Sequence, residues 1–256
     1  MISPALEQTT RRALASGALQ PIATETALID DAGVRFVVRS ASTLERKKFA
    51  RERPDPLGDY ERDLYVGDVP PAHYALLNKY PVVRSHILIV TRAFEHQEQL
   101  LTTADCAALG GLLAELDWLA FYNGGTAAGA SQARKHLQLV PLPLAPEVPV
   151  PVPTQPLFGR LPFRHAVAPL ASLDDLHAVY QDLLGRCAIQ SPPYNLLATR
   201  RWMLVVPRSR EHYESISVNA LGFAGSLFVR NRAELERVRR SGPMNVLRAV
   251  TLESPA

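Results

Sequence analysis

Residues 123–140 read NGGTAAGASQARKHLQLV, a loop of small residues that runs directly into a strand pattern. The glycines of the loop let the backbone approach a ligand closely, and its serine adds a hydroxyl group. From Lys135 to Val140 the side chains alternate between the two faces of the predicted strand. His136 and Gln138 then share one face, while Leu137 points to the other. The stretch therefore predicts a polar strand face beside a loop whose backbone amides are accessible to a ligand.

The polar face carries the residue types of nucleophilic catalysis. A neutral His136 could attack an electrophile through one ring nitrogen while the other nitrogen donates to a carbonyl group. Gln138 would offer an amide donor to a developing oxyanion or a phosphoryl oxygen. The loop 129–132 would add backbone amides and a hydroxyl as anion ligands. A lone strand histidine is more often a structural residue held by hydrogen bonds, so both interpretations stay open at this point.

The residues before this stretch predict helices and antiparallel strands. An amphipathic helix is expected over residues 4–19, as an N-terminal helical appendage within residues 1–20. A capping box at Thr102 begins a second helix, which apolar residues at helical spacing extend to Phe121. Strand composition occurs at 33–40, 64–66, 74–77 and 87–90, the last three as consecutive antiparallel strands, and a charged loop is expected over 44–56.

Nine prolines between residues 141 and 169 are too dense for a helix or a central strand. This segment is expected to be an extended connector between two parts of one unit that spans residues 1–256. The remaining predicted elements are helices over 172–187 and 233–240 and strands over 195–199, 202–207 and 221–229. The pattern of elements predicts an α+β fold, with an antiparallel sheet flanked by helices.

Composition excludes several classes of protein. With 47% hydrophobic and 21% charged residues, the chain has enough apolar material for a core. The net charge of +3 comes from scattered arginines without a basic stripe or interleaved aromatics, so no nucleic-acid partner is expected. The longest apolar run, 220–229, is too short to cross a membrane. Two distant cysteines, no metal-ligand spacing among the histidines and no signal-peptide pattern predict a cytoplasmic protein without a metal cage.

Three ordered blocks of the sequence resemble those of a known family. The segment 123–138 is similar to Asn-x-Gly…Gly-(Ala/Ser)-Ser-Gln-x-His-Lys-His-(Leu/Ile)-Gln, the core of the diadenosine tetraphosphate phosphorylases. These enzymes are also called ATP adenylyltransferases and belong to the histidine triad superfamily. Residues 77–91 and 217–226 resemble two further family blocks, and several ordered motifs are more specific than one. The resemblance extends from about residue 35 to the C-terminus and implies a histidine-triad-like fold of the hexose-phosphate uridylyltransferase branch.

The family's chemistry gives His136 and Gln138 catalytic roles. The resemblance implies that His136 attacks the α-phosphorus of diadenosine tetraphosphate, expels ATP and becomes an adenylylated histidine. Inorganic phosphate then resolves this intermediate to ADP, and the reverse reaction makes the dinucleotide from ATP and ADP. Gln138 would stabilise charge on the non-bridging oxygens.

The resemblance also implies a set of nucleotide-binding residues, some with a structural alternative. Lys48 lies in the charged loop, where a solvated charge is the alternative. For Asn78 and Lys79 the alternative is a structural role at the end of a strand. Ser226 and Arg230 could instead be the polar face of a half-exposed strand. The full set is Lys48, Asn78, Lys79, Asn123, Gly129, Ala130, Ser131, Gln132, Arg134, Asn219, Ala220, Leu221, Ser226 and Arg230.

One position departs from the family pattern. Arg134 stands where the family has the first histidine of His-Lys-His. In the superfamily that position orients the nucleophile through its backbone carbonyl, a role that any residue can fill. The arginine side chain is expected to add a permanent charge beside the phosphates, which would tighten substrate binding or lower the pKa of His136.

The expected partners are diadenosine polyphosphates, ATP, ADP and phosphate, bound by a monomer or a small homo-oligomer. No tightly bound cofactor is expected, and a divalent cation such as Mg²⁺ would accompany the polyphosphate through substrate oxygens and water. Two alternatives stay open: a nucleotidyltransferase that uses another nucleotide donor, and a nucleotide-binding sensor that has lost turnover through Arg134.

Overall fold

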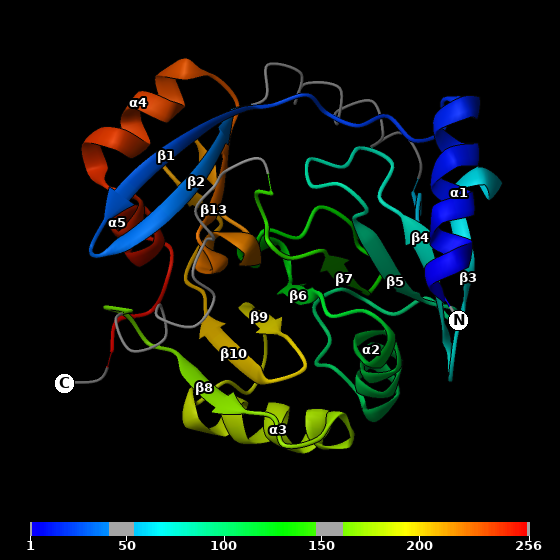
Figure 1. Cartoon of the computed structure of the whole chain (residues 1–256). Coiled ribbons are helices and arrows are strands. Elements are labelled where there is room, and N and C mark those ends of the chain that lie inside the picture. The colour runs from blue at the N-terminus through cyan, green and yellow to red at the C-terminus, as the bar shows by residue number, and fades with distance from the viewer. Residues whose placement is uncertain (1, 41–53, 147–160, 255–256) are drawn as a thin grey trace.

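A computed structural model describes residues 2–40, 54–146 and 161–254 of the chain (Figure 1). Its largest element is an eight-stranded sheet in which every neighbouring pair is antiparallel. From one edge to the other, the strands are β3 (Tyr65–Val69), β4 (His73–Leu77), β5 (Ile87–Thr91), β7 (His136–Val140), β6 (Leu119–Gly124), β9 (Tyr194–Ala198), β10 (Trp202–Pro207) and β8 (Ala166–Pro169).

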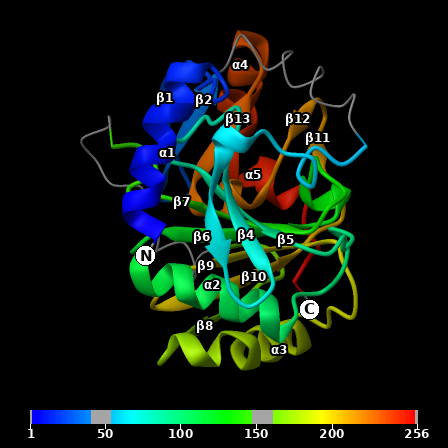
Figure 2. The same cartoon turned by 90° about the vertical axis from the view of Figure 1, so that its right-hand side faces the viewer.

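Helices α2 (Thr103–Glu115) and α3 (Leu176–Arg186) cover one face of this sheet (Figure 2). Helix α1 (Ile2–Ser16) packs beside the edge strand β3 and against α2. Leu137 and Leu139 of β7 belong to the hydrophobic cluster that these helices complete. Val140 belongs to the cluster on the opposite face, so the predicted alternation along this strand is confirmed.

A smaller sheet and two helices lie over the other face (Figures 1 and 2). The sheet consists of β1 (Glu25–Asp31), β2 (Val34–Ser40) and β13 (Ser226–Val229), with β13 parallel to β2. The helices are α4 (Arg232–Ser241) and α5 (Pro243–Arg248), and a short hairpin is formed by β11 (His212–Tyr213) and β12 (Ile216–Ser217). The fold class is the α+β arrangement that the sequence predicts.

The capping box at Thr102 is confirmed, but the helix that it begins is shorter than predicted. The side chain of Thr102 accepts from the Asp105 amide, and Asp105 bonds back to the Thr102 amide at 2.7 Å. The helix ends at Glu115, and residues 119–124 form the central strand β6 instead of its last turns. Both faces of β6 are buried, so its sequence has no polar alternation that would separate it from a buried helix.

The structure adds detail to the sequence expectations at three further places. The predicted strand 221–229 is a short 3-10 helix over Ala220–Ala224, followed by β13 after the left-handed Gly225. Strand β1 is not among the predicted strands. None of its side chains is fully buried, and only Ala27 and Ile29 give its inner face apolar character. The connector is described at 141–146 and 161–169, and its last residues form β8 at a sheet edge, where proline is tolerated.

Helix α1 begins at Ile2 and packs against the main core. Ile2, Leu6 and Ala13 are buried in the main core cluster. No helix in the described part of the chain is long and apolar enough to span a membrane.

Candidate functional site

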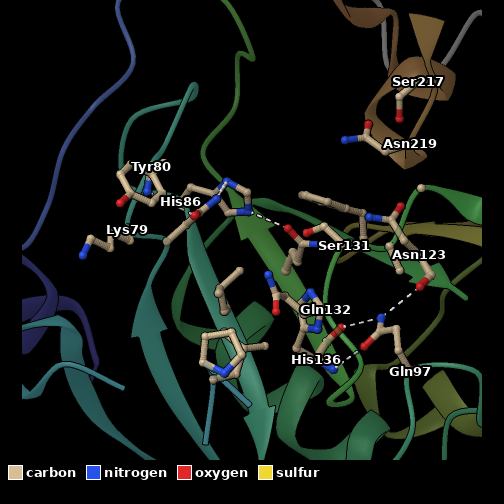
Figure 3. A pocket seen from close by; sticks show the side chains of 18 of the residues that line it. Lys79, Tyr80, His86, Gln97, Asn123, Ser131, Gln132, His136, Ser217 and Asn219 are labelled. Atoms are coloured by element: carbon tan, nitrogen blue, oxygen red, sulfur yellow. Dashed lines mark hydrogen bonds between the residues drawn. The ribbon is translucent and has the colours of Figure 1, made fainter. Parts of the chain in front are cut away.

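A cavity of about 1060 Å³ lies between the eight-stranded sheet and the smaller sheet with its neighbouring hairpin. Strands β4, β5, β6 and β7 contribute residues to it, as do the segment 54–61, the loop 129–133 and the β11–β12 hairpin. Figure 3 shows His86 and Tyr80 on one side of His136, and Ser217 and Asn219 on the other. Residues far apart in the sequence therefore meet around one buried histidine.

His136 is held in one tautomer by the backbone before it. Its Nδ1 lies 2.8 Å from the carbonyl oxygen of Arg134, which can only accept a hydrogen bond. Burial lowers the pKa of His136, although this hydrogen bond opposes the shift, so the ring is neutral at pH 7. The proton is then on Nδ1, and Nε2 carries the lone pair of a nucleophile. The expected orientation by the Arg134 carbonyl is confirmed.

Gln97 is a site residue that the sequence analysis missed. Its side-chain oxygen accepts from the His136 amide at 2.8 Å, and its Nε2 donates to the carbonyl oxygens of Asn123 (2.8 Å) and His136 (3.2 Å) (Figure 3). One buried amide side chain thus fixes the backbone on both sides of the nucleophile. No short motif marks such a residue, because it acts through hydrogen bonds to distant backbone groups.

His86 orients the side chain of Gln138. Asn78 Nδ2 donates to His86 Nδ1 at 3.0 Å, and His86 Nε2 donates to Gln138 Oε1 at 2.8 Å. The oxygen of the Gln138 amide is therefore turned toward His86, and its NH₂ group is turned toward the cavity that Gln138 lines. This is the orientation that a donor to phosphoryl oxygens requires. The sequence analysis considered the histidines other than His136 only as metal ligands, so this role of His86 was missed.

The small-residue loop is shaped by one glycine. Gly129 is left-handed at φ 90°, and a Cβ there would lie 2.8 Å from the Val218 carbonyl oxygen. The amides of Gly129 and Ala130 donate to Thr126 and Gly125 inside the turn, which differs from their expected role as anion donors. Gly129, Ala130, Ser131 and Gln132 nevertheless all line the cavity.

A buried arginine supports this loop from behind. Arg208 is 2% exposed, and it donates to Ala128 O (3.3 Å), Val218 O (2.9 Å) and the Asn195 side-chain oxygen. Asn195 in turn donates to Asn123 Oδ1 at 2.9 Å. Burial lowers the pKa of Arg208 to about 9. Neither Arg208 nor Asn195 was found from the sequence.

Replacing Arg208 with methionine is expected to destabilise the fold by about 3 kcal/mol, because it leaves several buried carbonyl groups without a donor. Urea unfolding measures the change. The control is Arg11→Met on α1, whose side chain is 73% exposed and should change stability by less than about 0.5 kcal/mol. Equal effects of the two substitutions would contradict the supporting role of Arg208.

The other predicted ligands are divided between the cavity and the scaffold. Asn219 lines the cavity and accepts from the Leu221 amide, and Leu221 also faces the cavity. Asn123 lines it too, but its oxygen accepts from the buried amide of Ala220 at 2.9 Å. Ser226 is placed elsewhere: it is fully buried between β13 and β2 and accepts from Arg39 at 2.9 Å. Ala220 and Ser226 therefore act as scaffold residues in the structure.

The described cations among the predicted nucleotide-binding residues are paired with carboxylates. Lys79 and Arg230 line the cavity, and they pair with Glu61 and Glu234. Arg134 does not line the cavity, and its guanidinium binds Asp55, so the structure differs from the expectation of a permanent charge beside the phosphates. Lys48 lies outside the described residues. Among the residues that the structure describes, no group of three or more histidine, cysteine, aspartate or glutamate side chains could hold a metal ion.

Two family models cover the chain. The Ap4A phosphorylase N-terminal domain matches residues 1–160, and the ATP adenylyltransferase C-terminal domain matches residues 159–253. They meet inside the proline-rich connector, although strands from both matched regions share the eight-stranded sheet.

Relatives from budding yeast agree with this assignment. Protein APA1 of Saccharomyces cerevisiae is 30% identical over 272 residues, covering 86% of this chain and 84% of the relative. Diadenosine 5',5'''-P1,P4-tetraphosphate phosphorylase 2 of the same yeast is 31% identical over 240 residues, covering 72% of this chain and 71% of the relative. The crystal structure of yeast Ap4A phosphorylase Apa2 in complex with Ap4A superposes with a TM-score of 0.84 at 25% identity, over 100% of this chain and 98% of that one. The chain thus belongs to the family of Ap4A phosphorylases and ATP adenylyltransferases.

Proposed function

We propose that the protein cleaves diadenosine tetraphosphate (Ap4A) with inorganic phosphate to give ATP and ADP, and that it also catalyses the reverse adenylyl transfer. The observation that carries this proposal is the neutral His136, whose Nδ1 is held by a carbonyl group and whose Nε2 is left for attack. The cavity around it is of the size that ligand sites have, and the yeast relative named for this reaction is 31% identical to this chain over 240 residues.

The reaction would proceed in two displacements. Nε2 of His136 attacks an α-phosphorus of Ap4A, the N–P bond forms, and the P–O bond to ATP breaks. An oxygen of inorganic phosphate then attacks the same phosphorus, the N–P bond breaks, and ADP leaves. Because the imidazole is neutral before attack and its phosphoramidate remains reactive, one side chain serves both steps.

Gln138 would act on the charge that develops during both displacements. Its NH₂ group, oriented by His86, would donate to the non-bridging oxygens of the phosphoryl group as their charge grows. Asn78, Ser131 and Asn219 line the same cavity and would contact the remaining parts of the dinucleotide. A divalent cation would be held mainly by the polyphosphate and by water, as is usual for Mg²⁺ with phosphate substrates.

A phosphate-dependent cleavage assay on Ap4A tests this proposal. The expected products are ATP and ADP in equal amounts. When phosphate is omitted, cleavage should stop after a single turnover. Formation of two ADP molecules would indicate a hydrolase of another type. Binding of Ap4A without any product would indicate a nucleotide-binding sensor.

Replacing His86 with phenylalanine is expected to lower kcat about tenfold with little change in KM, because Gln138 loses the contact that orients its amide. The double variant with Gln138→Ala should be no slower than Gln138→Ala alone, since His86 acts through that side chain. Multiplicative losses in the double variant would show that His86 acts independently of Gln138.

A further inference from the structure

The segment 54–61 forms one wall of the cavity, and we refer to it as the 54–61 wall. Pro56, Leu57, Asp59, Tyr60 and Glu61 line the cavity. Leu57 is buried in a small hydrophobic cluster together with residues of β4 and β5. The 54–61 wall is thus packed against β4 and β5 and faces the cavity.

An ion pair fastens one end of this wall. Arg134 Nε lies 3.0 and 2.9 Å from the two carboxylate oxygens of Asp55, and Nη2 lies 2.6 Å from Oδ2. Nη1 of the same guanidinium donates to the carbonyl oxygens of Thr91 (2.9 Å) and Arg92 (3.1 Å) at the end of β5. The Arg134 and Asp55 side chains are 10% and 29% exposed, so the pair is shielded from solvent far more than an ordinary surface pair.

The backbone of the wall is built around this ion pair. The Gly58 amide donates to Asp55 Oδ1 at 3.0 Å. A Cβ at Gly58 would lie 2.3 Å from Asp55 Oδ2 and 2.6 Å from Arg134 Nη2. Any larger residue at position 58 would therefore push the carboxylate and the guanidinium apart.

Arg134 also holds the nucleophile, through a different group. Its carbonyl oxygen accepts from His136 Nδ1, while its side chain holds Asp55. The position of the 54–61 wall and the position of the His136 ring are therefore both set by one residue. The side chain itself does not line the cavity, so it does not reach a bound phosphate directly.

We propose that Arg134 and Asp55 form a clamp that positions the 54–61 wall against bound nucleotide, so that both are positioning residues for substrate binding and neither is a phosphate ligand. The inference rests on the proposed function for its substrate. The wall lines the cavity with residues other than His136 and Gln138, so in this proposal it contacts parts of the nucleotide that do not react. The carbonyl that orients His136 belongs to the backbone. Loosening the clamp thus weakens nucleotide binding and leaves the chemical step nearly unchanged.

Neutral substitutions on the two sides of the ion pair distinguish a clamp from a phosphate ligand. If Arg134 served the polyphosphate by its charge, Asp55→Asn would release that charge and tighten binding, whereas Arg134→Gln would weaken it. A clamp predicts that both substitutions weaken nucleotide binding. Gly58→Ala separates the ion pair without changing any charge, so a clamp predicts weaker binding there as well.

The experiment measures kcat and KM for Ap4A phosphorolysis, and the Kd for Ap4A on a His136→Ala background that removes turnover. Asp55→Asn, Arg134→Gln and Gly58→Ala are each expected to raise KM and Kd about tenfold, with kcat within about twofold of wild type. The double variant of Asp55 and Arg134 should bind no more weakly than Arg134→Gln alone. Thermal unfolding confirms that each variant is folded.

The matched control is Asp30→Asn, which breaks an exposed Asp30–Arg35 pair with similar two-point geometry (2.7 and 2.8 Å) outside the cavity and should change neither constant. Tighter binding by Asp55→Asn, additive losses in the double variant, or unchanged binding in Gly58→Ala would each overturn the clamp. If the wild-type protein still releases ATP and ADP from Ap4A, any of these variant results would leave the proposed function intact. A wild-type protein that does not bind Ap4A would overturn both.

Discussion

Replacing His136 with alanine is expected to lower kcat by several orders of magnitude, because the substitution removes the atom that forms the covalent intermediate. The fold should persist, since the packing of β7 against the helices depends on Leu137 and Leu139 on its other face. Steady-state phosphorolysis of Ap4A measures the loss, and circular dichroism with thermal unfolding measures the fold.

The chain offers a closely matched control for this substitution. His165 Nδ1 lies 2.8 Å from the carbonyl oxygen of Phe163, two residues before it, as His136 Nδ1 does from Arg134. His165 does not line the cavity, so His165→Ala should leave kcat within about twofold of wild type. His136→Ala activity within about tenfold of wild type, a change of only ~1.4 kcal/mol, would exclude His136 as the nucleophile.

Gln138→Ala is expected to lower kcat roughly 10²-fold, about 2.7 kcal/mol, with a smaller effect on KM. The physical reason is that the Gln138 amide donates to oxygens whose charge grows only as the phosphoryl group is transferred. The two kinetic constants, measured separately for phosphorolysis, decide between a transition-state role and simple binding.

Gln138→Glu sharpens this test, because it keeps the size and the contact with His86 but replaces the donor with an anion. It should be at least as slow as Gln138→Ala. Gln181→Ala, on the exposed face of α3, is the control and should leave both constants unchanged. A Gln138→Ala variant that changes only KM would assign Gln138 to ground-state binding.

The parts of the site that could be predicted from the sequence are those with a local signal. The alternation from residue 135 to residue 140 places His136 and Gln138 on one face, and the structure has both in the cavity. The capping box at Thr102 fixed the start of α2, whereas the central strand β6 has two buried faces and was merged with that helix. Local pattern is informative where a face is exposed and fails where both faces are covered.

Positioning residues escaped the sequence analysis for a different reason. Gln97, His86 and Arg208 act through hydrogen bonds to groups 10 to 80 residues away, and no spacing rule describes such contacts. Arg134 shows the same limit. The family resemblance implied that its carbonyl lies beside His136, but nothing in the sequence indicated that Asp55, 79 residues earlier, binds its side chain.

The central claim is that His136 carries the adenylyl group between the two displacements. Ap4A labelled in its adenosine groups, mixed with the enzyme in the absence of phosphate and digested after denaturation at alkaline pH, measures this directly. The account predicts label on the peptide that contains His136, release of that label as ADP when phosphate is added before denaturation, and no label in His136→Ala. Turnover without covalent label, or label on a peptide that lacks His136, would contradict it.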